Sequence, residues 1–243
     1  MTTLPTLTQI DKAQQKTVWD FGNKILYDLC YNNFNHSEPQ HTLTKVLFIG
    51  RIYSAAVERR KKQDTEINDN FYIETVEPTF RTSQLDTYLS ELTKNCISVS
   101  KQTIQEILEA HFYLTTLLKT ITNLEKRSFS SKYLHFHLPD LFYIYDSRTS
   151  RALRKFKVEI PNDLQHILTL NKVDKEYATF ACKMFSLKCK IQDEYNITLT
   201  NRELDNLLLE MANNDEIEKV RRKTTGNIGI ANSGAGHWSN QQR

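Results

Sequence analysis

Two side chains near the middle of the chain have types and a spacing that could do chemistry. Lys132 is followed by Asp146, and both lie in residues 127–148, the densest run of aromatic, basic and potentially catalytic side chains in the sequence. A lysine packed beneath aromatic groups loses part of its solvation, which lowers its pKa and leaves free amine to act as a nucleophile. A facing carboxylate can stabilise positive charge or handle the proton, so such a pair suits attack on an electron-poor carbon.

The segment before Pro139 predicts a short helix that carries Lys132. No helix breaker lies between Phe129 and Leu138, whereas Pro139 lacks an N–H and disfavours helix in the residue before it. Residues 141–145 are apolar and aromatic, so we expect them to be buried.

Asp146 stands directly before a basic helical pattern at residues 147–156. An Asp in this position can cap the free N–H groups of the helix that follows it. Residues 127–157 therefore form a predicted unit of helix, turn, buried segment and capped helix.

The same residues also fit plainer explanations. Solvated lysines and Asp caps are common, and spacing alone does not bring Lys132 and Asp146 together. His135 and His137 lie two positions apart, so on a helix they point to different sides and would chelate one metal ion only if the backbone there is not helical. We expect no metal and no cofactor.

The composition predicts an all-α, multi-helix globular domain. The chain has 243 residues with only 6 glycines and 5 prolines, and Leu, Lys, Glu and Gln are frequent. We expect one domain at residues 1–220 and a flexible tail, basic and rich in Gly, at 221–243. Helices are predicted over 11–33, 40–61, 82–94, 100–124, 129–138, 147–156, 161–170, 174–194 and 200–211.

Charge and hydropathy limit the classes of partner. The net charge is only +3, but Lys and Arg cluster at residues 59–62, 148–157 and 221–223, which fits either a polyanion-binding face or solvated surface. No run approaches the roughly 20 apolar residues of a membrane span, and the N-terminus lacks the pattern of a signal peptide. We expect a cytoplasmic, monomeric protein with no membrane partner and with Cys30, Cys96, Cys182 and Cys189 as reduced thiols.

Several common enzyme classes lose support because their motifs are absent. The sequence holds no Gly-rich phosphate loop, no Gly-x-Ser-x-Gly elbow and no His-Glu-x-x-His motif. His111 lies on the apolar stripe of the predicted central helix, where a lone histidine is typically a hydrogen-bonded core residue.

The Lys132 and Asp146 spacing, with a turn and an apolar segment between them, resembles the helix-hairpin-helix DNA glycosylase superfamily. Four stretches are more specifically similar to the bacterial proteins described as 8-oxoguanine DNA glycosylase-like and found among phage-defence genes: residues 48–60, 127–137, 142–147 and 201–209. The resemblance covers most of residues 15–212.

The resemblance implies a DNA N-glycosylase with AP-lyase activity. Lys132 would attack the sugar C1′ of a damaged nucleotide and form a Schiff base, and Asp146 would assist. The substrate base would be flipped into a pocket, while N–H groups and basic side chains hold the backbone. The residues implied are Arg148, Arg151 and Arg154 for phosphate, and Tyr133, His135 or Phe142 for the base pocket.

The chain departs from the superfamily pattern just before the lysine. Superfamily hairpins carry glycines there, whereas this chain has Ser128, Phe129, Ser130 and Ser131; Ser130 and Ser131 are the candidates to replace the backbone contacts with hydroxyl groups. Two other functions remain open: a noncatalytic nucleic-acid-binding or defence-accessory protein with defence-system protein partners, and a structural helical adaptor.

Overall fold

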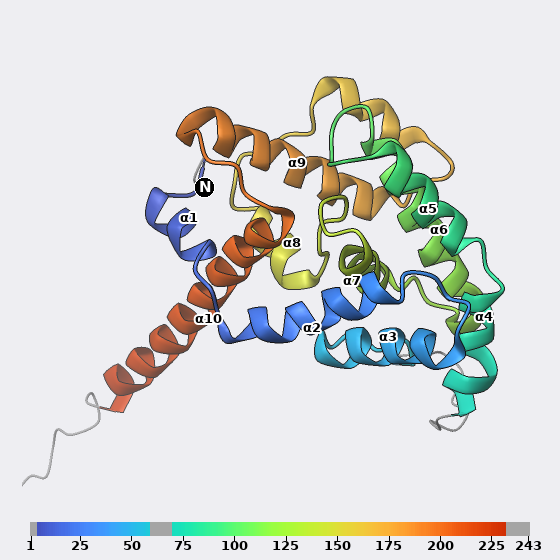
Figure 1. Cartoon of the computed structure of the whole chain (residues 1–243). Coiled ribbons are helices and arrows are strands. Elements are labelled where there is room, and N and C mark those ends of the chain that lie inside the picture. Colours follow the sequence, from blue (N-terminus) through green and yellow to red (C-terminus); the bar gives the residue numbers. More distant parts are fainter. Residues whose placement is uncertain (1–3, 59–69, 232–243) are drawn as a thin grey trace, which may run out of the picture.

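The regular elements of the described chain are helices, which confirms the all-α prediction (Figure 1). The computed structural model describes residues 4–58 and 70–231, and for residues 218–231 only the backbone. The basic cluster at 59–62 and the end of the predicted tail, 232–243, lie outside the described residues. The helices in order are α1 Leu7–Ala13, α2 Val18–Asn32, α3 Pro39–Ile52, the π-helix η1 Phe71–Val76, α4 Glu77–Arg81, α5 Leu85–Asn95, α6 Ile104–Thr122, α7 Arg127–His137, α8 Ser147–Leu153, the 3₁₀-helix η2 Asn162–Thr169, α9 Lys175–Tyr195 and α10 Asn201–Ala231.

Two hydrophobic clusters form the core. One is built from α1, the start of α6, α8, η2, α9 and α10. The other is built from α2, α3, η1, α4, α5, most of α6 and α7. Burial of apolar area in both clusters supplies the main stabilisation of the fold. The polar side chains described below lie where the two clusters meet.

Helix α7 is the central element of the second cluster. It packs against α2, α3 and α6 (Figure 1), and Phe129 to His137 are all buried. Its start is fixed from the other cluster, because the Arg127 Nε donates to both carboxylate oxygens of Asp174 at 2.8 and 2.6 Å. Asp174 also caps α9, so α7 is tied directly to the first turn of α9.

The N-terminal region differs from the single predicted helix at 11–33. It forms α1 and α2 with a break between them, because Thr17 and Asp20 make a capping box that starts a new helix at Val18. Helix α3 also ends earlier than predicted, at Ile52. The chain turns through Ser54, whose φ is 53°, and passes so close to Gly50 that a Cβ there would meet the Ala56 Cα at 3.1 Å.

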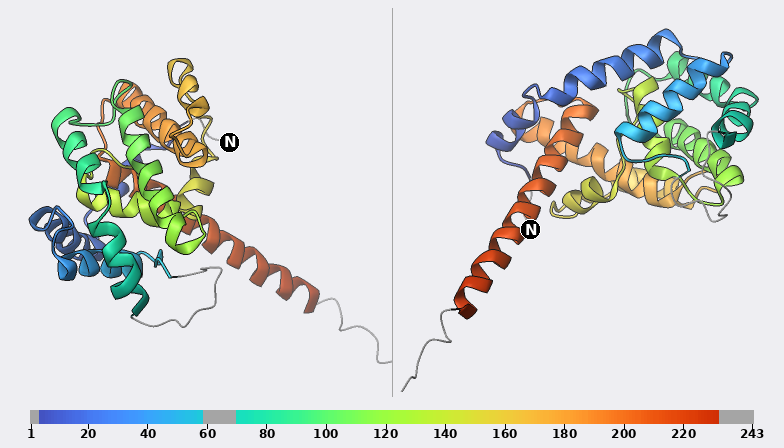
Figure 2. Two further views of the ribbon diagram at one scale, coloured as in Figure 1. Left: turned by 90° about the vertical axis from the view of Figure 1, so that its right-hand side faces the viewer. Right: turned by 90° about the horizontal axis from the view of Figure 1, so that it is seen from below.

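Helix α10 is longer than the predicted helix at 200–211. The predicted capping box is confirmed, with Thr200 N–H donating to Glu203 Oε2 at 2.7 Å, but the helix continues to Ala231, where we expected tail. Figure 2 shows its C-terminal half projecting from the rest of the molecule. The extension begins against α8 and the turn after it, through ion pairs of Arg148 on α8 with Glu216 and of Lys155 in the turn with Asp215. From composition alone, the residues of this extension are polar and give no sign of a helix that packs on α8.

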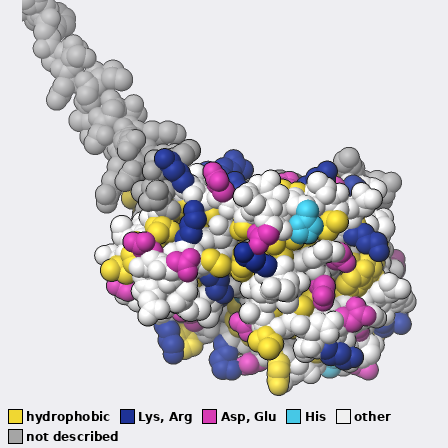
Figure 3. Space-filling view, turned by 90° about the horizontal axis from the view of Figure 1, so that it is seen from above, with side chains coloured by type: hydrophobic (Ala, Val, Ile, Leu, Met, Phe, Trp, Pro, Cys, Tyr) yellow, Lys and Arg dark blue, Asp and Glu magenta, His cyan; other side chains and the backbone are white. Residues whose placement is uncertain are grey.

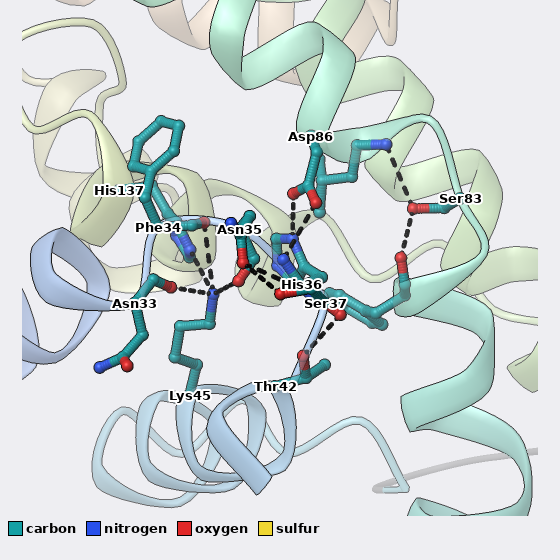
Figure 4. A network of polar contacts seen from close by, with 12 residues as sticks. Asn33, Phe34, Asn35, His36, Ser37, Thr42, Lys45, Ser83, Asp86 and His137 are labelled. Atoms are coloured by element: carbon teal, nitrogen blue, oxygen red, sulfur yellow. Dashed lines mark hydrogen bonds and ion pairs between the residues drawn. The ribbon is translucent and has the colours of Figure 1, made fainter. Parts of the chain in front are cut away.

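The loop between α2 and α3 is held by a buried lysine (Figure 4). The Lys45 ammonium donates to the carbonyls of Asn33, Phe34 and Asn35 at 2.7, 3.4 and 2.9 Å, and its Nζ lies 3.3 Å from His137 Nε2. Next to it, His36 joins Asp86 of α5 to Tyr133 of α7 through its two ring nitrogens, at 2.5 and 2.6 Å. The loop is therefore fixed against α7 by polar contacts.

The surface seen in Figure 3 carries mixed charge. Lys and Arg side chains are interspersed with Asp and Glu, and no broad area of one sign is visible on that face. Within the described residues, no helix combines the length and the apolar character needed to cross a membrane. Cys30, Cys96, Cys182 and Cys189 are free thiols.

Candidate functional site

A cavity of about 660 Å³ opens where the two hydrophobic clusters meet. This volume lies within the range of small-molecule pockets, about 300–1,000 Å³. The lining comes from α1 and the α1–α2 turn, α2, the end of α3, α7, the start of α8, and α10. The lining residues are Lys12, Ala13, Gln15, Lys16, Thr17, Trp19, Ile52, Tyr53, Ser54, Lys132, Asp146, Arg148, Arg202, Asn206, Leu209, Glu210 and Asn213.

Lys132 reaches this cavity from the second turn of the buried helix α7. Its side chain is only 5% exposed. The Nζ donates to Ser128 Oγ at 3.0 Å and to the Tyr53 carbonyl at 3.3 Å. Burial lowers the pKa of Lys132 from its ordinary 10.5, against the opposing effect of nearby carboxylates. The amine therefore loses its proton more readily than an exposed lysine does.

Asp146 reaches the same cavity and caps α8, as its sequence position predicts. Its Oδ1 accepts from the backbone N–H groups of Arg148 and Thr149, both at 2.9 Å. Its Oδ2 lies 3.8 Å from the Lys132 Nζ, and the Asp146 side chain is 24% exposed. The cap fixes one oxygen and leaves the other facing the amine. The structure thus brings together the two residues that the sequence singled out.

The sequence did not predict the largely buried ion pair of Arg202 and Asp205 on α10. Arg202 Nη1 is 2.9 Å from Asp205 Oδ2, and Arg202 lines the cavity. The Asp205 side chain is 1% exposed, and burial raises the pKa of its carboxyl to about 7. A sequence signal exists, because Asp205 lies beside Leu204 and Leu208 on the apolar face of the helix, where a charge is unusual.

Aromatic and apolar groups complete the cavity wall. The Tyr53 ring has the Lys132 Nζ and the Arg202 guanidinium each 5.9 Å from its centre. Trp19, on α2, is 62% exposed. Ile52 and Leu209 add apolar surface. The wall thus offers both stacking surfaces and cations to a ligand.

The three arginines predicted to face phosphate are separated by the structure. Arg148 lines the Lys132 cavity, donates to Asn213 and lies 3.9 Å from Glu216. Arg151 is exposed on α8. Arg154 is exposed too, but it lines a different cavity of about 340 Å³ between α8 and α9. The cations at the Lys132 cavity besides Arg148 are Lys12, Lys16 and Arg202, which were not predicted.

Ser130 and Ser131, the predicted phosphate contacts, lie in the core and do not line the Lys132 cavity. Both side chains are fully buried. Ser131 Oγ accepts from the Tyr145 N–H at 3.0 Å and so ties α7 to the segment before α8. The reason is that helix α7 begins at Arg127, five residues before Lys132, so these serines lie inside a buried helix and not in an open hairpin.

The predicted base-pocket residues are also core residues in this structure. Tyr133, His135 and Phe142 are fully buried in or against the second cluster, and none of them lines the Lys132 cavity. Tyr133 donates or accepts at His36 Nε2, while His135 Nδ1 lies 2.8 Å from the Phe142 carbonyl. Because α7 is buried on all sides, aromatic side chains near Lys132 in sequence pack into the core. Trp19 and Tyr53 are the aromatic groups at the cavity instead.

His135 and His137 do not converge on one point. His135 Nε2 lies 2.7 Å from the Tyr27 hydroxyl, whereas His137 contacts the Tyr133 carbonyl and Lys45. Among the described residues no group of three His, Cys, Asp or Glu side chains could hold a metal ion. His111 is a core residue, as predicted: it is buried and stacks on Tyr177 with ring centres 3.6 Å apart.

Comparison with protein-family models, with curated proteins and with solved structures found no match for this chain.

Proposed function

We propose that the chain is a DNA N-glycosylase with AP-lyase activity that acts through Lys132. The single observation that carries the proposal is the nearly buried Lys132 amine, which opens into a ligand-sized cavity 3.8 Å from the Asp146 carboxylate. A buried amine that gives up its proton easily, with a carboxylate fixed beside it, can act as a Schiff-base nucleophile.

The reaction follows from these two groups. The neutral Lys132 amine attacks C1′ of a nucleotide held in the cavity, and the bond from C1′ to the base breaks with its electron pair leaving on the base. Asp146 stabilises the positive charge that develops at C1′. The proton lost from nitrogen passes through Asp146 to solvent, and the leaving base takes a proton from solvent.

The second half of the reaction breaks the strand. Opening of the sugar ring converts the C1′ adduct into an iminium, which makes the C2′ protons acidic. Removal of one C2′ proton expels the 3′ phosphate by β-elimination, and water then releases Lys132 from the imine. No group outside the protein, the DNA and water is needed for atoms and charge to balance.

The cavity wall supports a nucleotide as the ligand. Trp19 and Tyr53 offer faces on which a base stacks, and Lys12, Lys16 and Arg148 provide cations for the phosphates beside it. A base inside this cavity must leave the duplex stack, so mismatched, damaged or single-stranded substrates are favoured.

An incision assay tests the proposal. Duplex and single-stranded DNA carrying 8-oxoguanine or an abasic site are incubated with wild type, Lys132→Gln and Asp146→Asn. We expect strand cleavage by wild type and a loss of about 10²–10⁴-fold in Asp146→Asn, the usual range for acid–base groups, with none from Lys132→Gln.

The cations around the cavity favour one alternative, a noncatalytic nucleic-acid-binding protein. DNA binding measured on the same samples decides between the two. Binding without cleavage of any substrate by folded wild type would replace the enzyme proposal with the binding protein, which could serve as a defence-accessory component.

A further inference from the structure

The ion pair between Arg202 and Asp205 has no role in the reaction as written, although Arg202 lines the same cavity as Lys132 and both contact the Tyr53 ring. We propose that Arg202 and Asp205 are positioning residues for Lys132, forming with Asp146 a four-charge cluster whose balance sets how readily Lys132 is deprotonated. The inference rests on the proposed function for its biological meaning.

The pair is largely buried, and each partner keeps one polar atom outside the ion pair. Asp205 is fully buried, and its Oδ1 has no hydrogen-bond partner among the described residues. The Nε of Arg202 is likewise buried with no partner in the described part of the chain. Buried polar atoms normally find partners, because an unsatisfied one costs roughly 1–3 kcal/mol.

Tyr53 links the pair to the amine. The Lys132 Nζ and the Arg202 guanidinium each lie 5.9 Å from the centre of the Tyr53 ring. Its carbonyl accepts from the Lys132 Nζ, and its hydroxyl donates to Asn23 Oδ1. The two cations therefore share one aromatic neighbour, and their side chains are only 5% and 16% exposed.

The charges around the amine balance. Lys132 and Arg202 are positive, and Asp146 and Asp205 are negative. Asp146 and Asp205 raise the pKa of Lys132, while burial and Arg202 lower it. The pKa of Asp205 is raised by burial and by the negative charge of Asp146, and it is lowered by the positive charges of Arg202 and Lys132. The groups that face Arg202 from the neighbouring helices are Asp20 and Tyr27 of α2 and Tyr53.

This balance gives the cluster a way to keep its total charge. When Lys132 loses its proton to become a nucleophile, one positive charge disappears from a buried region. Burial raises the pKa of the Asp205 carboxyl to about 7, so this group can take up a proton near neutral pH and restore the balance. The proton moves through solvent in the cavity, since no direct contact joins the two side chains.

The test measures the ionisation of Lys132 without any DNA. Trace acetic anhydride acetylates only the neutral amine, and the Lys132 peptide is quantified by mass spectrometry across a pH series. Removing the negative charge in Asp205→Asn should move the Lys132 profile to lower pH. Removing the positive charge in Arg202→Gln should move it to higher pH. Each shift should reach at least about 0.5 pH unit, a fraction of the roughly 1–3 units that a neighbouring charge can produce.

Two controls separate this effect from general damage. Lys24, whose side chain is 74% exposed on α2, should keep its profile in all variants. The double variant Arg202→Gln/Asp205→Asn should lie between the two single variants. If Asp205→Asn does not fold, Arg202→Gln decides alone: a shift to higher pH supports the inference, and an unmoved profile overturns it.

Opposite shifts support the inference whether or not DNA is cleaved, so the failure of the proposed function is seen separately, in the incision assay. Shifts in the same direction, or profiles that coincide with wild type, mean that the pair is structural only and overturn the inference.

Discussion

At the scale of single residues, burial of the charged Lys132 side chain lowers the free energy of unfolding. Its ammonium has one hydroxyl and one carbonyl as hydrogen-bond acceptors and a carboxylate 3.8 Å away, and its side chain is only 5% exposed. Burying a charge with so few partners is expensive. A cost of this kind at a cavity is typical of functional sites.

Replacing this charge should therefore stabilise the protein. We expect Lys132→Met to raise the free energy of unfolding at pH 7 by about 0.5–2 kcal/mol, the usual gain from relieving a functional site. The pKa of Lys132 is lower in the folded than in the unfolded state, so the charge penalty is complete at low pH. It disappears as pH rises through the unfolded-state value of 10.5, and so should the gain.

Urea unfolding of both proteins at pH 7 and at pH 11 checks this sign. A destabilised Lys132→Met variant would mean that the lysine is a structural ion-pair partner and not a strained nucleophile.

Lys45 provides the matched comparison, because it is also a buried lysine. Its ammonium donates to three carbonyls of the α2–α3 loop, and burial lowers its pKa to about 8. We expect Lys45→Met to destabilise the protein by about 1–3 kcal/mol, because the carbonyls lose their donor. The same unfolding measurement at pH 7 checks the opposite sign. Equal effects of the two substitutions would contradict the different roles assigned to the two lysines.

At the scale of elements, Asp146 has two separable roles. Its Oδ1 caps α8 and its Oδ2 faces the amine. Asn is as good a cap as Asp, whereas replacing a cap with Ala costs about 0.5–2 kcal/mol.

We therefore expect Asp146→Asn to keep the stability of wild type while losing activity, and Asp146→Ala to lose both. Thermal unfolding and the incision assay, run on the same preparations, provide the two readings. Full activity in Asp146→Asn would leave the residue with the capping role only.

The elements themselves were largely predictable where local signals were strong. Pro139, the Asp146 cap and the Thr200–Glu203 capping box each mark a helix boundary that the structure contains. The break before Val18 was missed although Thr17 and Asp20 carry its signal, since the apolar spacing continues through it.

Other features depend on tertiary contacts that the sequence does not display. The extension of α10 beyond Met211 packs on α8 and the turn after it through Arg148 and Lys155, partners far away in sequence. Tyr133, His135 and Phe142 do not line the Lys132 cavity, because proximity to Lys132 in the sequence does not place a buried side chain at the cavity. Arg202 and Trp19 reach the site from helices near the two ends of the chain.

At the scale of the whole molecule, the site lies where two hydrophobic clusters meet, and cations from several helices surround it. Binding to DNA through these cations should depend strongly on salt, because each neutralised phosphate releases counterions. If Lys12, Lys16, Arg148 and Arg151 all contact phosphate, the slope of log affinity against log salt should be about −3 to −4 for duplex DNA.

Lys16→Gln should reduce that slope by about one unit without changing the fold, since Lys16 is exposed. Fluorescence anisotropy with labelled duplex at several salt concentrations provides the slopes. A DNA affinity that does not change with salt concentration would favour the structural adaptor over both nucleic-acid functions.

The most direct test of the central claim is capture of the Lys132 Schiff base. Protein is incubated with DNA carrying an abasic site or 8-oxoguanine, borohydride is added, and the adduct is digested and mapped by mass spectrometry. The account predicts one covalent adduct, located at Lys132, absent from Lys132→Gln and retained in Lys45→Met if that variant folds. An adduct at another lysine, or no adduct on any substrate with folded protein, would contradict it.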